Sequence, residues 1–408
     1  MKKNETSVIL LFVLWESARG GDAEQAVLAD INSKFKILKQ FEVLWTQEAW
    51  ERHLQSFYGL VSPVWQIKRL RNGTGAFRVI IVEDSSPQWG ERRDMRGRKD
   101  IVDLNAWNAK KIYRKLVGVK DGVHSSVNER ETRQNIAMLL DESLDEFLAR
   151  KDLDGSISAL TSLPAVECGW RSLEHFFSII NECTSYIVLR NADQVFKAKS
   201  DLHTDIDLLV SNINEFIAFS GAVKVKSNSH HAAYLINIAG YPVKFDLRTP
   251  EDGYYDALWA QEMLDSRVLK DGLYVPSPEN AKWSLLYHAL AHKKSVSADY
   301  AILFDSWDKR NVLCEKLAHW MNSHAYKATF PLDRKVTFYP DNLPKNITIR
   351  RRKFDIKPYF NMHLSSKHIK IHIFPYCRIP NIFRIQIRIA SLFKIDFCLG
   401  LVRDTIIL

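Results

Sequence analysis

Three aspartates in two apolar segments are the residues of this 408-residue chain best suited to chemistry. Asp205 and Asp207 enclose one isoleucine at the start of the apolar run 206–210, and Asp246 lies inside the run 243–247. Such runs predict strands, and side chains two apart in a strand point the same way. Hard divalent cations such as Mg²⁺ or Mn²⁺ prefer paired carboxylates of this kind and keep positions open for phosphates.

Paired aspartates at a strand start are more often a solvated edge or a loop cap than a metal site. The order of segments distinguishes this pair. An expected strand ends in Leu189-Arg190-Asn191, a polar interval follows, and the third aspartate lies in the next strand but one. Over residues 172–293 this order resembles the polymerase-β-like nucleotidyltransferase superfamily, in particular bacterial proteins of surface-polysaccharide gene clusters.

The resemblance implies that Asp205, Asp207 and Asp246 are metal ligands. The metal would orient the phosphates of a nucleoside triphosphate while an acceptor hydroxyl attacks. The Gly-Ser pair that holds the phosphates in that family is replaced here by residues 189–192. Arg190 and Lys199 are therefore expected to bind phosphate.

A second phosphate site is indicated around His124. Arg96-Gly97 follows a Pro-containing loop, and the segment 121–126 precedes an amphipathic segment at 129–140. This order resembles the active-site half of nucleoside diphosphate kinase, which implies that His124 carries a phosphoryl group covalently and that Arg96 contacts phosphate. The alternatives are an ordinary loop histidine and a degenerate fold that only binds a nucleotide or phosphosugar. Residues 100–120 are expected to be an insertion in a long polar loop.

The segment pattern predicts an α/β (α+β) protein with two mixed-sheet domains. A ferredoxin-like, nucleoside-diphosphate-kinase-like domain is expected at 1–150, a nucleotidyltransferase-like domain at 165–330 and a basic extension at 331–408. The boundary is placed where residues 151–161 become charged, small and polar. Strands are expected at 8–15, 41–45, 77–82, 186–189, 206–210, 233–238 and 243–247, and helices at 22–39, 50–58, 129–140, 172–182, 256–267 and 279–293.

Residue usage points to the cytoplasm. The apolar run 8–15 superficially resembles a signal peptide, but no small-x-small cleavage site follows, so a buried first strand is expected. The five cysteines are widely spaced and contain no CxxC pair, which favours a reducing compartment. His288 and His292 lie four residues apart on an expected helix, and we expect partly exposed, hydrogen-bonded histidines there in preference to metal ligands.

Positive charge is concentrated at the end of the chain. Residues 331–408 hold 15 Lys/Arg against five Asp/Glu, so the first 330 residues have 42 basic and 43 acidic residues. Segregated charge indicates a local anionic partner. The runs 367–373 and 382–389 alternate apolar with basic residues and predict strands, with an amphipathic helix on a membrane surface as the competitor. Anionic lipid or a phosphorylated glycan suits this face. Nucleic acid is not expected, since stacked aromatics are missing.

Together these features predict a cytoplasmic bacterial enzyme, with peripheral attachment at the inner face of the membrane as the open alternative. It would transfer a nucleotidyl or phosphoryl group, and the resemblance alone implies a glycan or sugar-phosphate acceptor in capsule or lipopolysaccharide biosynthesis. One alternative is a glycosyltransferase whose aspartates hold a nucleotide-sugar through the metal. The other is a non-catalytic protein that binds nucleotide or glycan at the membrane surface.

Overall fold

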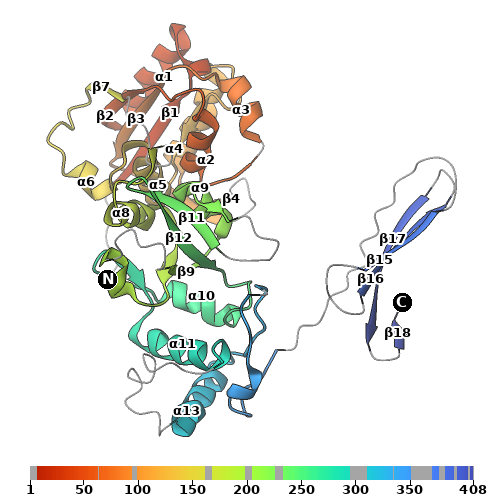
Figure 1. Cartoon of the computed structure of the whole chain (residues 1–408). Coiled ribbons are helices and arrows are strands. Elements are labelled where there is room, and N and C mark those ends of the chain that lie inside the picture. Colours follow the sequence, from red (N-terminus) through yellow and green to blue (C-terminus); the bar gives the residue numbers. More distant parts are fainter. Residues whose placement is uncertain are drawn as a thin grey trace. The chain divides into compact units, whose positions relative to one another are not determined.

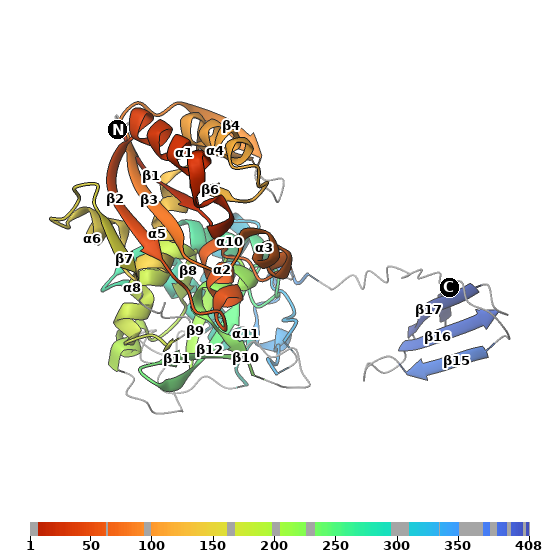
Figure 2. The same ribbon diagram turned by 90° about the horizontal axis from the view of Figure 1, so that it is seen from above.

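The chain is an α+β protein, seen from two directions in Figures 1 and 2. The computed structural model describes residues 7–62, 64–93, 99–160, 168–197, 205–225, 233–294, 310–333 and 335–350, and the strands within 370–407. Two compact units are formed, Met1–Arg350 and Arg351–Leu408. Residues near the end of the first unit belong to its core, since Leu343 and Ile347 are buried there.

The first sheet is buried on both faces. Its order is β6-β1-β3-β2-β7, and only β2 and β7 are parallel neighbours. Alternate residues of β1 enter opposite cores, with Leu11 and Val13 in one and Leu10 and Phe12 in the other. A helical layer therefore covers each face. The strands are β1 (Val8–Leu14), β2 (Lys36–Val43), β3 (Phe77–Asp84), β6 (Val123–Ser125) and β7 (Ile157–Leu160).

The first sheet and its helices form the first half of this unit, residues 7–160. The helices of this first half divide between the two faces of the sheet. One core includes residues of α2 and α5, and the other includes residues of α1 and α4. The hairpin of β4 and β5 leads into α4. The bounds are α1 (Gly21–Lys34), α2 (Trp50–Tyr58), α3 (Val64–Asn72), α4 (Leu104–Leu116), α5 (Glu129–Leu140), α6 (Leu144–Leu148), β4 (Trp89–Arg93), β5 (Lys99–Asp103) and the 3₁₀ turn Glu16–Ala18.

Most expected elements of the first half are confirmed, and two expectations are wrong. The helix expected at 22–39 ends at Lys34, and β2 begins at Lys36. Lys39 is only 3% exposed, and its ammonium lies 2.9 Å from Asp152 in the loop before β7, the strand that pairs with β2. The expected insertion at 100–120 contains α4, which begins at the N-cap Asp103 and buries Ala106, Ala109 and Tyr113. These positions recur at helical spacing, so tertiary packing stabilises a helix there.

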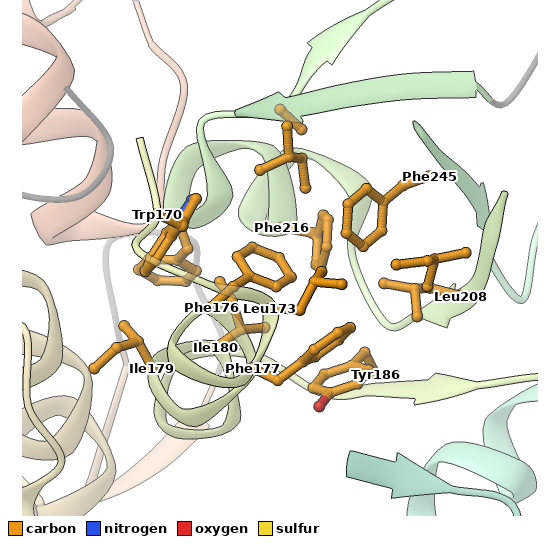
Figure 3. Packing of buried hydrophobic residues seen from close by; sticks show 14 of the residues in the cluster. Trp170, Leu173, Phe176, Phe177, Ile179, Ile180, Tyr186, Leu208, Phe216 and Phe245 are labelled. Carbon is orange, nitrogen blue, oxygen red and sulfur yellow. The ribbon is translucent and has the colours of Figure 1, made fainter. Parts of the chain in front are cut away.

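The second sheet has the order β10-β11-β12-β9-β8, and only β9 and β12 are parallel. Figure 3 shows the aromatic core on one face of this sheet, which includes Phe176 of α8 and Phe245 of β12. The ring centroids of these two residues are 5.5 Å apart. The opposite face packs through Ile187 and Leu209 against α10, α11 and α13. The bounds are β8 (Tyr186–Val188), β9 (Ile206–Val210), β10 (Val223–Lys224), β11 (Ala233–Ile238), β12 (Tyr241–Arg248), α8 (Leu173–Cys183), α9 (Ile213–Ser220), α10 (Ala257–Asp265), α11 (Pro278–Ala291) and α13 (Arg310–Ser323).

The two halves of the first unit are packed together through helices. Ala137 and Met138 of α5 lie in the aromatic core of the second sheet. Arg133 of α5 forms an ion pair of 3.2 Å with Glu182 of α8. Gly59, which ends α2 with a φ of 57°, lies so close to α9 that an added Cβ would be 2.3 Å from the Phe219 ring. A side chain at residue 59 would therefore separate the halves.

The second unit contains an antiparallel sheet in the order β15-β16-β17-β18. The strand interpretation of the basic runs is confirmed for β15 (Lys370–Pro375) and β16 (Ile382–Ile389), which are followed by β17 (Phe393–Val402) and β18 (Thr405–Ile407). Among the helices that the structure describes, none combines the length and the apolar character needed to cross a membrane.

We expect Phe176→Ala to destabilise the protein by about 3–5 kcal/mol, because it removes a fully buried ring from the aromatic core. Urea denaturation followed by circular dichroism measures this change. The control is Leu70→Ala, whose side chain is 86% exposed and whose expected effect is below about 0.5 kcal/mol. Equal losses for the two variants would contradict the placement of this core.

Candidate functional site

The structure brings the three predicted aspartates together. Asp246 lies directly beside Asp207 in the parallel register of β9 and β12, and Asp205 lies two residues before Asp207. Ile206 and Leu208 enter the aromatic core, so the alternation of β9 turns the acids to the opposite face. The three carboxylates therefore share one face at the beginning of β9.

Two of these acids are held by basic side chains. Asp207 Oδ2 lies 2.7 Å from Arg190 Nη2, and Asp205 Oδ2 lies 2.6 Å from Lys244 Nζ. The hydrogen bond to Asp205 raises the pKa of Lys244. Sequence reasoning missed Lys244. The signal was present, because Lys244 lies two residues before Asp246 in one strand and must share its face.

Asp246 forms no ion pair with any residue that the structure describes, although the charges of Arg248 and Lys244 act on it. Among the described residues, its buried Oδ1 has no hydrogen-bond partner. Burial raises its pKa; Arg248 opposes the rise, whereas Asp207 and Asp205 add to it. An acceptor that is buried and unsatisfied costs free energy, and a bound cation would offset this cost.

The donor chemistry suits Mg²⁺ or Mn²⁺, although the acids are not arranged as a formed metal site. Within the described ranges, no three His, Cys, Asp or Glu side chains converge closely enough to hold a metal ion. Three carboxylates on one face, one of them with an unsatisfied oxygen, are nevertheless a hard-cation donor set. Occupation would require Asp207 and Asp205 to turn from their basic partners.

Arg190 is fixed by a buried polar network. Its Nη1 donates to the Tyr254 hydroxyl at 3.2 Å and to Nδ1 of His288 at 3.0 Å. Tyr254 and His288 are themselves hydrogen-bonded, and His292 Nε2 contacts the Tyr254 carbonyl at 3.1 Å. Burial opposes the charge of Arg190, but Tyr254 and Asp207 outweigh it and raise its pKa. The guanidinium expected to bind phosphate thus binds Asp207 in this state.

The expectation of partly exposed histidines at 288 and 292 is wrong. His288 is 4% exposed and His292 is 8% exposed, because α11 is covered on several sides by the core below the second sheet. Burial lowers the pKa of His292 to about 4, and burial followed by the charge of Arg190 lowers that of His288. Both imidazoles are therefore neutral hydrogen-bonding groups at physiological pH.

His124 is not a loop histidine, because it lies in β6 and pairs with Val13 of β1. Its ring is 6% exposed and lies edge-on to Phe57 and Tyr58, with centroids 5.3 and 5.1 Å apart. Its Nε2 lies 3.4 Å from Asn135 Oδ1. Burial, together with the charges of Lys110 and Lys68, lowers its pKa well below the ordinary value, so the ring is neutral.

Three cations near His124 were missed by sequence reasoning. They are Lys68 of α3 and Lys110 and Arg114 of α4, and all three lower the pKa of His124. The last two lie at i and i+4, a spacing that places them on one helix face. The signal was lost because this segment was assigned to a loop. The expected phosphate ligands Arg96 and Lys199 lie outside the described residues.

A hollow of about 480 Å³ lies between α11 and α13. None of the predicted site residues lines it. Its lining residues are Lys282, Trp283, Val312, Glu315, Lys316, His319, Trp320 and Ser323. We assign the candidate site from the convergent acids and not from this hollow.

No protein-family model matches the chain, and no curated protein matches it. We therefore infer function from the residues and from their arrangement.

We expect Asp246→Asn to keep or raise the thermal midpoint at pH 7, measured in EDTA. The raised pKa means that ionising Asp246 costs stability as pH rises above the unfolded value of about 3.9. The variant removes this cost, and its advantage should disappear near pH 4, where the wild-type carboxyl becomes neutral. A midpoint that falls by several degrees at pH 7 would show that the charge of Asp246 stabilises the fold.

Proposed function

We propose that residues 165–330 form a nucleotidyltransferase-like domain that transfers a nucleotidyl or phosphoryl group with Mg²⁺ or Mn²⁺. One observation carries the proposal: Asp246 lies beside Asp207 in parallel register, and Asp205 shares their face. The proposed donor is a nucleoside triphosphate. A divalent cation held by these three acids would neutralise charge on its phosphates.

Sheet topology supports the finer fold assignments. The order β8-β9-β12, with β9 antiparallel to β8 and parallel to β12, puts the strand before the paired acids and the strand of the third acid on opposite sides of β9. In the first half, the order β6-β1-β3-β2 with antiparallel neighbours and α1 between β1 and β2 agrees with a ferredoxin-like, nucleoside-diphosphate-kinase-like fold. Both assignments belong to the proposal.

Arg190 would act on phosphate from the position it already holds. Tyr254 and His288 fix one side of the guanidinium, and the other side faces Asp207. A planar guanidinium can pair with carboxylate or phosphate oxygens in the same fork geometry. If Asp207 turns to a cation, Arg190 loses its only carboxylate partner among the described residues and can bind the donor phosphates.

The acceptor, partner and location remain proposals. A glycan or sugar phosphate of capsule or lipopolysaccharide biosynthesis is the proposed acceptor, and the cytoplasmic face of the membrane is the proposed location. The net positive charge of residues 331–408 supports attraction to an anionic lipid surface. Liposome binding that survives removal of the second unit alone, residues 351–408, would argue against it.

The competing function is a non-catalytic protein that binds nucleotide or glycan. One observation favours it: Arg190 and Lys244 already neutralise two of the acids without a metal. A glycosyltransferase, the other alternative, would release the sugar from a nucleotide-sugar. Product analysis with nucleoside triphosphates and nucleotide-sugars separates the three functions.

Covalent phosphate on His124 stays a prediction for the first half. Its neutral ring and the nearby cations Lys68, Lys110 and Arg114 support phosphate chemistry, whereas its 6% exposure restricts access. Acid-labile phosphate on the purified protein after incubation with a nucleoside triphosphate is the measurement that decides between these two observations.

We expect Asp207→Asn to lower Mg²⁺-dependent turnover by at least about 100-fold, the order typical for losing charge stabilisation at a reacting centre. Nucleoside triphosphates with sugar and polyol-phosphate acceptors are the substrates, and nucleotide products are measured. The variant removes one negative charge and one possible metal ligand and preserves the side-chain shape.

Asp265→Asn is the matched control, because Asp265 is an exposed acid at the end of α10 whose carboxylate accepts a hydrogen bond from Gln261 and not from Arg190 or Lys244. It should keep wild-type turnover. Mg²⁺-dependent turnover that Asp207→Asn leaves intact would refute the proposed site. Absence of turnover from wild type, with nucleotide binding retained, would favour the non-catalytic alternative.

A further inference from the structure

Lys68 lies in a group of aromatic rings at one end of the first sheet. Its ammonium nitrogen is 3.8 Å from the Tyr58 ring centroid, 5.4 Å from that of Trp15 and 6.0 Å from that of Trp65. It also donates a short hydrogen bond to the Tyr58 hydroxyl. The Tyr58 ring stacks on Trp65 at 5.4 Å, so the hydroxyl and the amine are held together.

No carboxylate forms an ion pair with Lys68 in the described part of the chain. The acid with the largest effect on Lys68, Asp121, is paired with Arg71 at 3.5 Å. Two further cations are close enough to repel the ammonium form, namely Arg114 and Lys110. Each is anchored to the backbone of β6, Arg114 Nε to Val123 at 2.7 Å and Lys110 Nζ to Ser125 at 3.2 Å.

This environment disfavours a charged amine. The pKa of Lys68 is lowered to about 7; burial is the largest cause, Asp121 opposes it, and Arg114 and Lys110 act in the same direction as burial. An exposed lysine has a pKa of about 10.4 and is almost wholly protonated at neutral pH. A larger fraction of Lys68 than of an exposed lysine is therefore neutral at pH 7 and carries a free electron pair. A desolvated lysine beside other cations is the arrangement that makes an amine nucleophilic.

We propose that Lys68 forms an imine with a small anionic aldehyde or ketone. The nitrogen lone pair attacks the carbonyl carbon and gives a carbinolamine. The carbonyl oxygen then leaves as water with the two amine hydrogens, and a C=N bond remains. No oxidant or reductant is needed for this step. The Tyr58 hydroxyl, already bonded to the amine, is placed to relay a proton, and Lys110 and Arg114 supply positive charge for the anionic group.

The test uses the full-length protein and pyridoxal phosphate, an anionic aldehyde, with borohydride to reduce the imine. Adducts are mapped by mass spectrometry. We expect Lys68 to be labelled at least about 10-fold faster at pH 7 than the exposed Lys115 of α4. The rate at Lys68 should rise with pH, level off above about 7 and fall when inorganic phosphate competes for Lys110 and Arg114.

Two comparisons make the result decisive. Lys68→Arg keeps the positive charge and should abolish the adduct, and pyridoxal, which has no phosphate, should react more slowly with wild type. Labelling of Lys68 no faster than that of Lys115, or a rate that still rises near pH 10, would overturn the proposal. The wild-type pH profile decides this even if the variant fails to fold. The outcome is independent of the acids on β9 and β12.

Discussion

The site in the second half depends on one electrostatic constraint: like charges must lie side by side. The parallel register of β9 and β12 places Asp207 next to Asp246, with Asp205 on the same face. Adjacent carboxylates in a half-buried position repel and resist ionisation together. The protein meets this constraint with Arg190 and Lys244 and leaves the third acid with a raised pKa. The negative charge of Asp246, which no ion pair among the described residues neutralises, is the physical basis for proposing a cation there.

The surrounding structure restricts how Arg190 can move to accommodate a cation between the acids. Arg190 is held by neutral acceptors on Tyr254 and His288, and both lie in the core beneath the sheet. His288 cannot become a competing cation at physiological pH, because its pKa is lowered by burial and by Arg190. Removing one partner of such a network leaves a charge uncompensated, which is costly in a low-dielectric site. Arg190 can therefore exchange one anion for another more readily than it can leave.

Sequence patterns predicted the second sheet better than the chemistry around it. The apolar runs of β9 and β11 mark strands directly, and the spacing of Asp205 and Asp207 predicts a shared face. The polar network around Arg190 joins positions 190, 254 and 288, which are far apart in the sequence. No local sequence pattern predicts contacts between residues so widely separated. In the first half, α4 was missed because two of its three buried positions are small alanines, and lysines and an arginine follow them. Lys110 and Arg114, two of the cations around His124, were missed with it.

The most direct test of the central claim is a crystal structure with Mn²⁺ and a non-hydrolysable nucleoside triphosphate. We predict an anomalous peak that marks Mn²⁺ coordinated by oxygens of Asp205, Asp207 and Asp246. Asp207 would be turned away from Arg190, and the guanidinium would contact the nucleotide phosphates. A fully occupied nucleotide elsewhere, with the ion pair between Asp207 and Arg190 intact and no peak between the acids, would contradict it.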